Sequence, residues 1–256
     1  AAGTTPSAIA MDPSGKFLYV ANYYSNDVSA FTINSTTGAL TAVSGSPYSV
    51  GSNATSVAVS PQGGFVYVVS INNGIAAFSI NAATGALSPV VGSPFAAGSG
   101  SVGGITINAA GTIAYVAGGS SATVSSISAF AINSTSGALT AVAGSPFSAG
   151  SYATEVTIDP TGRFAYIPNE LSNTVSAYTV NSSTGTLAPV AGSPYTVGNG
   201  PSSVTVDPSG TFAYVTNDND NSISIFEINT ATGVLTQASG SPYTGQLWGP
   251  WSMTFY

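Results

Sequence analysis

The fold is decided by a stretch that returns five times along the chain, and in its last copy residues 203–217 read SVTVDPSGTFAYVTN. Residues 203–206 alternate small or polar with branched apolar side chains, the period of two that predicts a strand with one buried face. Residues 207–210, Asp-Pro-Ser-Gly, predict a tight turn, because proline presets φ and glycine accepts the geometry. Residues 212–215 then predict a second strand that returns beside the first.

The same unit continues outward into two more strands. Residues 222–228 alternate imperfectly as a third strand, residues 229–233 form an Asn-x-x-x-Gly turn, and residues 234–236 begin a fourth strand. A Gly-Ser-Pro-aromatic tetrad that begins at Gly240 closes the unit. Four antiparallel strands in one repeat are the content of a propeller blade.

The spacing of these motifs sets the number of repeats. The second-strand tyrosine recurs at Tyr19, Tyr67, Tyr115, Tyr166 and Tyr214, in steps of 48, 48, 51 and 48 residues. A period of this length filled with short strands indicates propeller blades rather than a helical solenoid. We therefore expect an all-β fold, a five-bladed β-propeller in one domain over residues 1–256. Its repeats fall at approximately 6–53, 54–101, 102–152, 153–200 and 201–249, with a terminal strand at 250–256.

Two of these motifs resemble a known family. Residues 19–22, YVAN, and residues 214–217, YVTN, are preceded by Asp-Pro-Ser-Gly and followed by Thr-Gly-x-Leu. Together they resemble the YVTN repeat of lactonase-type β-propellers, and the resemblance covers nearly the whole chain. It implies the propeller fold and a lactonase-like activity at a cavity with polar positions, usually His, Arg and carboxylates. Family lactonases are typically seven-bladed, whereas five repeats occur here.

One strand is surplus to five closed blades. Residues 251–255 repeat the first-strand pattern of residues 7–11. One interpretation is that one terminal strand completes the first blade while the other lies on an edge. The second is that the segment is cut from a longer propeller. The third is that the surplus strand pairs with another copy of the chain, because an unpaired edge offers backbone donors and acceptors.

Charge and composition limit the partners. Lys16 and Arg163 are the two basic residues against nine acidic ones, the net charge is −7, and charged residues make up 4% of the chain. No basic patch could neutralise nucleic-acid phosphates, and no apolar run is long enough for a transmembrane segment. There is no cysteine, and Ala1-Ala2-Gly3 would fit a mature end left by signal cleavage. We expect an extracellular or cell-surface protein.

Catalytic residues are scarce. The chain has no His and no Cys, which excludes a Ser/His/Asp triad, a Cys/His pair and a His-based zinc site. Glu155 is the exception, because the other repeats place small residues at its first-strand position, which should face the central channel: Ala8, Ser56, Gly104, Ser203 and Ser252. Glu155 could coordinate a metal, accept hydrogen bonds from a ligand, act as a base if desolvated, or bind only channel water. Paired with Glu170, it also leaves a two-carboxylate glycosidase open.

In the predicted propeller the loops between second and third strands and the connections between repeats share one rim, which varies in sequence and carries acidic and aromatic residues. Aromatic side chains there could stack on sugar rings: Tyr23, Tyr24, Tyr152, Trp248 and Trp251. The two tryptophans could instead cover the seam of the ring. Asp218 and Asp220 offer oxygen ligands suited to Ca²⁺ but lack EF-hand spacing, and no other cofactor is expected. Solvated loop carboxylates are the simpler explanation of the acidic residues.

We therefore expect an exported, non-catalytic β-propeller that serves as a binding or self-assembling surface module, with polymerisation through the terminal strand as one route. The expected partners are further copies of the chain, or a glycan or small ligand on the variable loops. Two alternatives stand beside this expectation: a lectin-like carbohydrate-binding propeller, and a lactonase-like hydrolase that uses Glu155.

Overall fold

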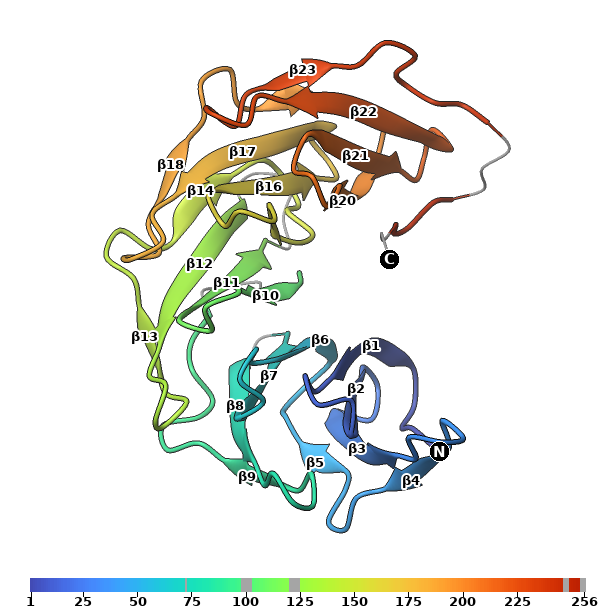
Figure 1. Ribbon diagram of the computed structural model, residues 1–256, viewed down its shortest axis with the longest axis vertical. Coiled ribbons are helices and arrows are strands. Elements are labelled where there is room, and N and C mark those ends of the chain that lie inside the picture. The colour runs from blue at the N-terminus through green and yellow to red at the C-terminus, as the bar shows by residue number, and fades with distance from the viewer. Residues whose placement is uncertain (72, 98–102, 120–124, 246–248, 254–256) are drawn as a thin grey trace. The chain divides into compact units, whose positions relative to one another are not determined.

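The structure is a computed structural model that describes residues 1–71, 73–97, 103–119, 125–245 and 249–253. All regular secondary structure assigned within these ranges is β-strand, and the strands form five antiparallel sheets (Figure 1). No helix of the described residues is long and apolar enough to cross a membrane. The predicted all-β class of antiparallel repeats is confirmed, and each sheet contains the expected path of four strands, to which three of the five sheets add a short fifth strand.

The chain divides into two compact units. The first unit contains residues 1–116 and 130–141, and the second contains residues 117–129 and 142–256. Two whole sheets lie in each unit, and the strands of the third sheet are shared between them.

The first unit holds the first two sheets. One has the order β1-β2-β3-β4 with β5 paired to β3, and the other has the order β6-β7-β8-β9. The strands of the first are β1 (Pro6–Met11), β2 (Phe17–Asn22), β3 (Asp27–Ile33), β4 (Leu40–Ala42) and β5 (Tyr48–Ser49). Those of the second are β6 (Ala54–Val59), β7 (Phe65–Ser70), β8 (Gly74–Ile80) and β9 (Leu87–Pro89).

The remaining sheets repeat this order. The third contains β10 (Ile105–Ile107), β11 (Ile113–Gly118), β12 (Ser125–Ile132), β13 (Leu139–Ala141) and β14 (Phe147–Ala149). The fourth contains β15 (Thr157–Ile158), β16 (Phe164–Asn169), β17 (Thr174–Val180), β18 (Leu187–Pro189) and β19 (Tyr195–Thr196). The fifth contains β20 (Pro201–Val206), β21 (Phe212–Asn217), β22 (Ser222–Ile228) and β23 (Leu235–Gln237).

The turn after the first strand is built by its aspartate. Asp207 Oδ1 accepts the backbone N–H groups of Thr211 (2.7 Å) and Phe212 (2.8 Å), so the carboxylate holds the start of β21 in place. Asp12 makes the same pair of bonds to Lys16 and Phe17. A carboxylate that accepts backbone N–H groups satisfies donors the turn would otherwise leave unpaired.

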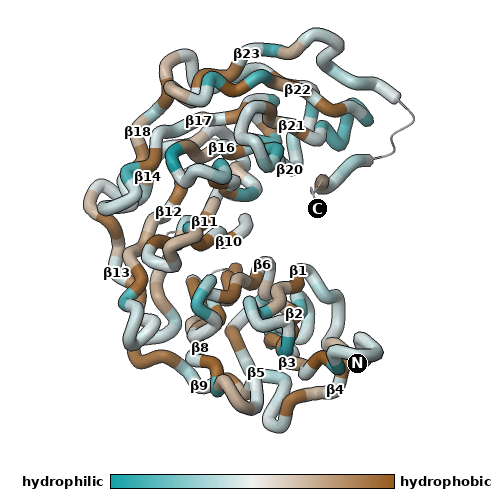
Figure 2. The backbone as a smooth tube through the Cα atoms, in the orientation of Figure 1, coloured by the Kyte–Doolittle hydropathy of each residue, from teal (hydrophilic) through white to brown (hydrophobic). Residues whose placement is uncertain are grey.

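Successive sheets are tied together by the tyrosine of the second strand. The hydroxyl of Tyr19 donates to the Gly85 carbonyl at 3.1 Å, and Tyr67 and Tyr166 make the matching bonds to Gly137 and Gly233. All three tyrosines are fully buried. The apolar residues concentrate on the strands, as the brown segments along β12 illustrate (Figure 2). Buried Tyr–Gly hydrogen bonds therefore join successive sheets.

One face of the first sheet is uncovered. Ile9 on β1 is 64% exposed, whereas the residues at its position in later repeats are 2–7% exposed: Val57, Ile105, Val156 and Val204. Leu40 on β4 is 49% exposed, whereas Leu87, Leu139, Leu187 and Leu235 are 5–7% exposed. The face that the preceding repeat buries elsewhere is thus open in the first repeat.

The described part of the terminal segment, residues 249–253, lies against β20. Ser202 Oγ donates to the Pro250 carbonyl (3.0 Å) and Thr205 Oγ1 to the Met253 carbonyl (2.6 Å). Thr154 and Thr157 make the corresponding bonds to the Ser202 and Val204 carbonyls one repeat earlier. Residues 250–253 therefore lie against β20 as a first strand would, although no strand is assigned there.

Candidate functional site

Glu155 lies just before β15, where the ladder is short. β15 pairs with β16 at Thr157 and Ile158, and an isolated bridge joins Ala153 to Asn169, whereas the β1–β2 ladder also pairs residues 8–10. The partner strand explains part of this difference, because Pro168 stands in β16 where β2 has Ala21. Proline has no N–H to donate to a ladder. Regular strand pairing is therefore interrupted at residues 154–156.

The Glu155 carboxylate reaches across to the next repeat. Its Oε1 accepts the hydroxyl of Ser203 at 2.7 Å and the backbone N–H of Val204 at 2.9 Å. In the first unit Ser56, at the same position, accepts the N–H of Ile105 at 3.2 Å. Glu155 Oε1 therefore accepts the same backbone hydrogen bond from the next repeat as the Ser56 hydroxyl oxygen does. No described residue donates a hydrogen bond to Oε2.

Burial raises the pKa of the Glu155 carboxyl, and the hydrogen bonds from Ser203 and the Val204 N–H oppose that rise without cancelling it. The side chain is partly buried. Desolvation disfavours the charged form of a carboxyl, whereas donors to that form favour it. A carboxylate with a raised pKa is the better base near neutral pH.

An open pocket of about 390 Å³ surrounds this carboxylate. Its volume is within the range of small-molecule sites. Four of the lining residues carry a hydroxyl group, namely Thr157, Ser203, Thr205 and Ser252, and the others are Glu155, Ile158, Pro160, Val204, Val206 and Met253. Glu155 is the one ionisable side chain among the lining residues that the structure describes.

None of the predicted aromatic residues that the structure describes is a lining residue of this pocket. Tyr23 and Tyr24 belong to the first unit and contact each other edge to face, with ring centroids 4.9 Å apart. Tyr152 and Trp251 belong to the second unit, and neither lines the pocket, although Trp251 is 71% exposed and precedes the lining residue Ser252. Trp248 lies outside the described residues.

The loop acids form no metal centre among the described residues, where no group of three or more acidic side chains could hold an ion. Asp220 Oδ2 accepts the N–H of Asn199 at 2.5 Å and so fixes a neighbouring loop. Burial, and then the charge of Asp218, raise the pKa of Glu170. Glu170 does not line the Glu155 pocket, and the Asp218 and Asp220 site stays a prediction.

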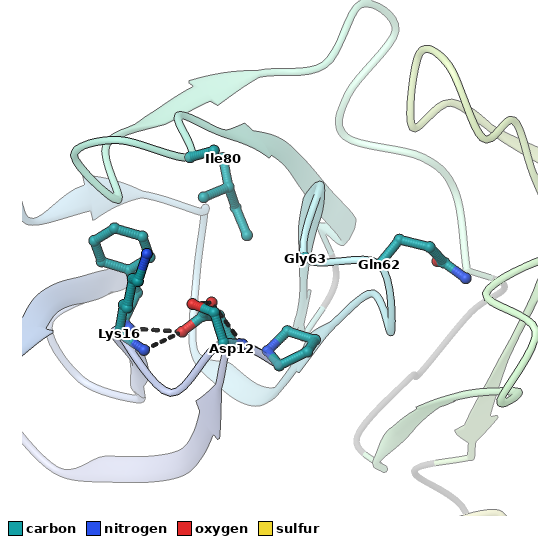
Figure 3. A pocket seen from close by; sticks show the side chains of 9 residues that line it. Asp12, Lys16, Gln62, Gly63 and Ile80 are labelled. Atoms are coloured by element: carbon teal, nitrogen blue, oxygen red, sulfur yellow. Dashed lines mark hydrogen bonds between the residues drawn. The ribbon is translucent and has the colours of Figure 1, made fainter. Parts of the chain in front are cut away.

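Neither cationic side chain is a lining residue of the Glu155 pocket. Lys16 lines a separate pocket of about 440 Å³ in the first unit, where Asp12 is bonded to its own turn and Gln62 points away from Lys16 (Figure 3). Gln62 Nε2 donates to the Ala110 carbonyl. Arg163 donates to the Thr230 carbonyl and the Thr161 hydroxyl, and its guanidinium lies 5.2 Å from the Phe164 ring centroid. Neither pocket contains both a cation and Glu155.

Several site residues escaped the sequence analysis. Thr157 and Thr205 line the pocket, and their hydroxyls donate to carbonyls of the next repeat. In sequence they look like ordinary strand residues. Pro168 could have indicated the interrupted strand pairing from the sequence, because no other repeat has a proline at this position after the second-strand tyrosine.

The chain belongs to the family described as "Lactonase, 7-bladed beta-propeller", whose profile matches residues 1–54 and 56–247. The predicted resemblance to lactonase-type propellers is confirmed. A search of curated proteins by sequence found no match.

Solved structures share the fold. A candidate 6-phosphogluconolactonase from Bacteroides uniformis is 20% identical with a TM-score of 0.76, over 91% of this chain and 69% of its own. A second candidate 6-phosphogluconolactonase, from Bacteroides fragilis, is 23% identical with a TM-score of 0.73, over 91% and 69%. The periplasmic gluconolactonase of Pseudomonas aeruginosa is 21% identical with a TM-score of 0.75, over 93% and 71%.

These comparisons overturn the expected function. The prediction of a non-catalytic, self-assembling surface module is wrong, because the chain belongs to a lactonase family and resembles proteins described as lactonases. The lactonase-like alternative fits better. The physical reason for the error is that the missing His and Cys exclude triads and thiol catalysis, but do not exclude a carboxylate base acting on water.

Proposed function

We propose that the protein hydrolyses a lactone, with Glu155 as the general base. The observation that supports this proposal is that the two oxygens of the Glu155 carboxylate differ in their hydrogen bonding. Oε1 is held by Ser203 and Val204, while Oε2 has no donor among the described residues. A base needs a fixed position and an available lone pair, and this arrangement offers both.

The proposed reaction needs no cofactor. Glu155 Oε2 takes a proton from water as the water oxygen forms a bond to the lactone carbonyl carbon. The tetrahedral intermediate then collapses, the bond from that carbon to the ring oxygen breaks, and the proton returns to the departing ring oxygen. The product is a hydroxy acid, and Glu155 is regenerated as a carboxylate. The Ser252 hydroxyl, which lines the pocket, is our candidate donor to the oxyanion.

We also propose how the repeats relate to the family fold. The five sheets would be five consecutive blades, and residues 250–253 would begin the first strand of a sixth. The hydrogen bonds of Ser202 and Thr205 to this segment support the idea. The 69–71% of the related structures that the chain covers matches five blades of seven. An exported location is proposed with it, supported by the low content of charged residues and by the periplasmic relative.

The test is turnover by variants at position 155. Wild-type protein should hydrolyse a lactone such as D-glucono-1,5-lactone above the spontaneous rate, followed by acid release in a weakly buffered solution. Glu155→Ser copies Ser56, which keeps the hydrogen bond to the next repeat without a carboxylate. We expect this variant to fold and to lose about 10²-fold or more of kcat/KM, the usual contribution of a general base. Full activity in a folded Glu155→Ser protein would refute the role.

A further inference from the structure

We infer that the pocket beside Lys16 is a second binding site, and that its ligand is a small carboxylate with an apolar body. This pocket lies in the first unit and is lined by residues of the first and second repeats. The inference does not depend on the proposed hydrolysis. It is carried by a cation without a partner, by the apolar side chains around it, and by a comparison with the fourth repeat.

The Lys16 ammonium is the charge that this pocket exposes. The side chain is exposed and lines the pocket, and no described residue forms a hydrogen bond or ion pair with it. Asp12 does not neutralise it, because this carboxylate is 7% exposed and bonded to its own turn. Asp12 Oδ1 accepts the backbone N–H groups of Lys16 and Phe17, and Oδ2 accepts the N–H and the hydroxyl of Ser14. The ammonium therefore keeps its donors for an anionic ligand.

The wall around this cation is largely apolar. Pro13, Phe17, Ile80 and Ala82 line the pocket. Ile80 points into it, whereas the polar end of Gln62 points away (Figure 3). The volume of about 440 Å³ is within the range of small-molecule sites. Apolar walls with one available cation suit a ligand that carries a single carboxylate on an apolar body.

The fourth repeat shows how an arginine occupies the corresponding place. Arg163 follows the same kind of turn as Lys16. Its guanidinium donates to the Thr230 carbonyl of the next repeat and lies 5.2 Å from the Phe164 ring centroid. Ala82 stands in the second repeat where the fifth has Thr230, but Lys16 makes no such bond among the described contacts. Lysine therefore leaves open a space that the planar fork of arginine crosses in the fourth repeat.

Binding of sodium benzoate to ¹⁵N-labelled protein, followed by NMR, tests the inference. Benzamide is the uncharged control of the same shape, and acetate has the charge without the ring. We expect benzoate to shift the backbone amide signals of Phe17, Gly63 and Ile80. It should bind about tenfold more tightly than benzamide, because hydrogen bonds to charged groups are stronger than neutral ones, and more tightly than acetate, because its ring is buried. Equal binding of either control, or no shift at these amides, would overturn the inference.

Variants at position 16 separate the charge from the open space. Lys16→Met keeps an unbranched side chain without the charge and should weaken benzoate binding by about tenfold. Lys16→Arg keeps the charge but should also weaken binding, because an arginine here can donate to the Ala82 carbonyl as Arg163 does to that of Thr230. Unchanged affinity in Lys16→Met would overturn the inference. Unchanged affinity in Lys16→Arg would overturn it too, because the open pocket would then be unnecessary.

The location of the site is controlled by a variant in the other pocket. Glu155→Gln removes the charge from the Glu155 pocket, which shares no lining residue with the Lys16 pocket. We expect Glu155→Gln to bind benzoate as the wild type does, with the same shifted amides. A changed affinity in Glu155→Gln, with shifts at Ser203 and Val204 in place of Phe17 and Ile80, would put the ligand in the Glu155 pocket and contradict the inference.

Discussion

At the scale of the residue, the comparison between Glu155 and Ser56 separates structure from function. Both side chains accept an N–H from the next repeat, so this bond alone cannot require a glutamate. The larger side chain brings a second oxygen and a charge into a partly buried pocket. Burying a charge costs free energy unless it is paired. This cost is consistent with our proposal that Glu155 serves chemistry rather than stability.

That cost predicts how stability depends on pH. The pKa of Glu155 is higher in the folded than in the unfolded state because of burial. The stabilisation that this difference adds to the free energy of unfolding is therefore complete below the unfolded-state pKa and is lost as pH rises through the folded-state pKa. Glu155→Gln keeps the acceptor for Ser203 and Val204 and removes the charge. We expect this variant to unfold at a higher urea concentration than wild type at pH 8, and at a similar one near pH 4. An advantage equal at both pH values would contradict the assignment.

At the scale of the element, local chemistry made much of the fold predictable. The third strand of the last repeat was expected over residues 222–228, and β22 spans Ser222–Ile228. Turns that bond their own backbone, such as the one at Asp207, depend on neighbours in sequence. The pocket could not be predicted in this way, because it depends on contacts between residues about 48 positions apart, such as Glu155 with Ser203.

The Asn-x-x-x-Gly turns offer a matched test of packing between sheets. Gly85 and Gly38 have nearly equal φ values of 74° and 71°, so alanine strains both backbones similarly. A Cβ at Gly85 would lie 2.4 Å from the Phe17 ring, whereas a Cβ at Gly38 would meet nothing within 4 Å. We expect Gly85→Ala to lower the free energy of unfolding by about 1–3 kcal/mol more than Gly38→Ala, the usual cost of overpacking. Urea denaturation of both variants measures the difference, and equal losses would show that the contact with Phe17 is unimportant.

At the scale of the whole molecule, the period of the repeats predicted the class of architecture. Five repeats could be counted because each copies the same turns, whereas the family is described as seven-bladed. Function was harder to predict than architecture. A single glutamate at a position of otherwise small residues suggested catalysis, whereas the absence of His and Cys argued against it. The family match favours catalysis, and the pocket that Glu155 lines offers a place for a substrate.

The central claim is that the Glu155 carboxylate activates water, and the pH dependence of kcat/KM on D-glucono-1,5-lactone tests it most directly. After subtraction of the spontaneous rate, kcat/KM of the wild type should rise with pH through a pKa above the ordinary glutamate range, because only the carboxylate is a base. The residual rate of Glu155→Gln should lack this step. The same profile in Glu155→Gln, or a wild-type rate no greater than the spontaneous one, would contradict the account.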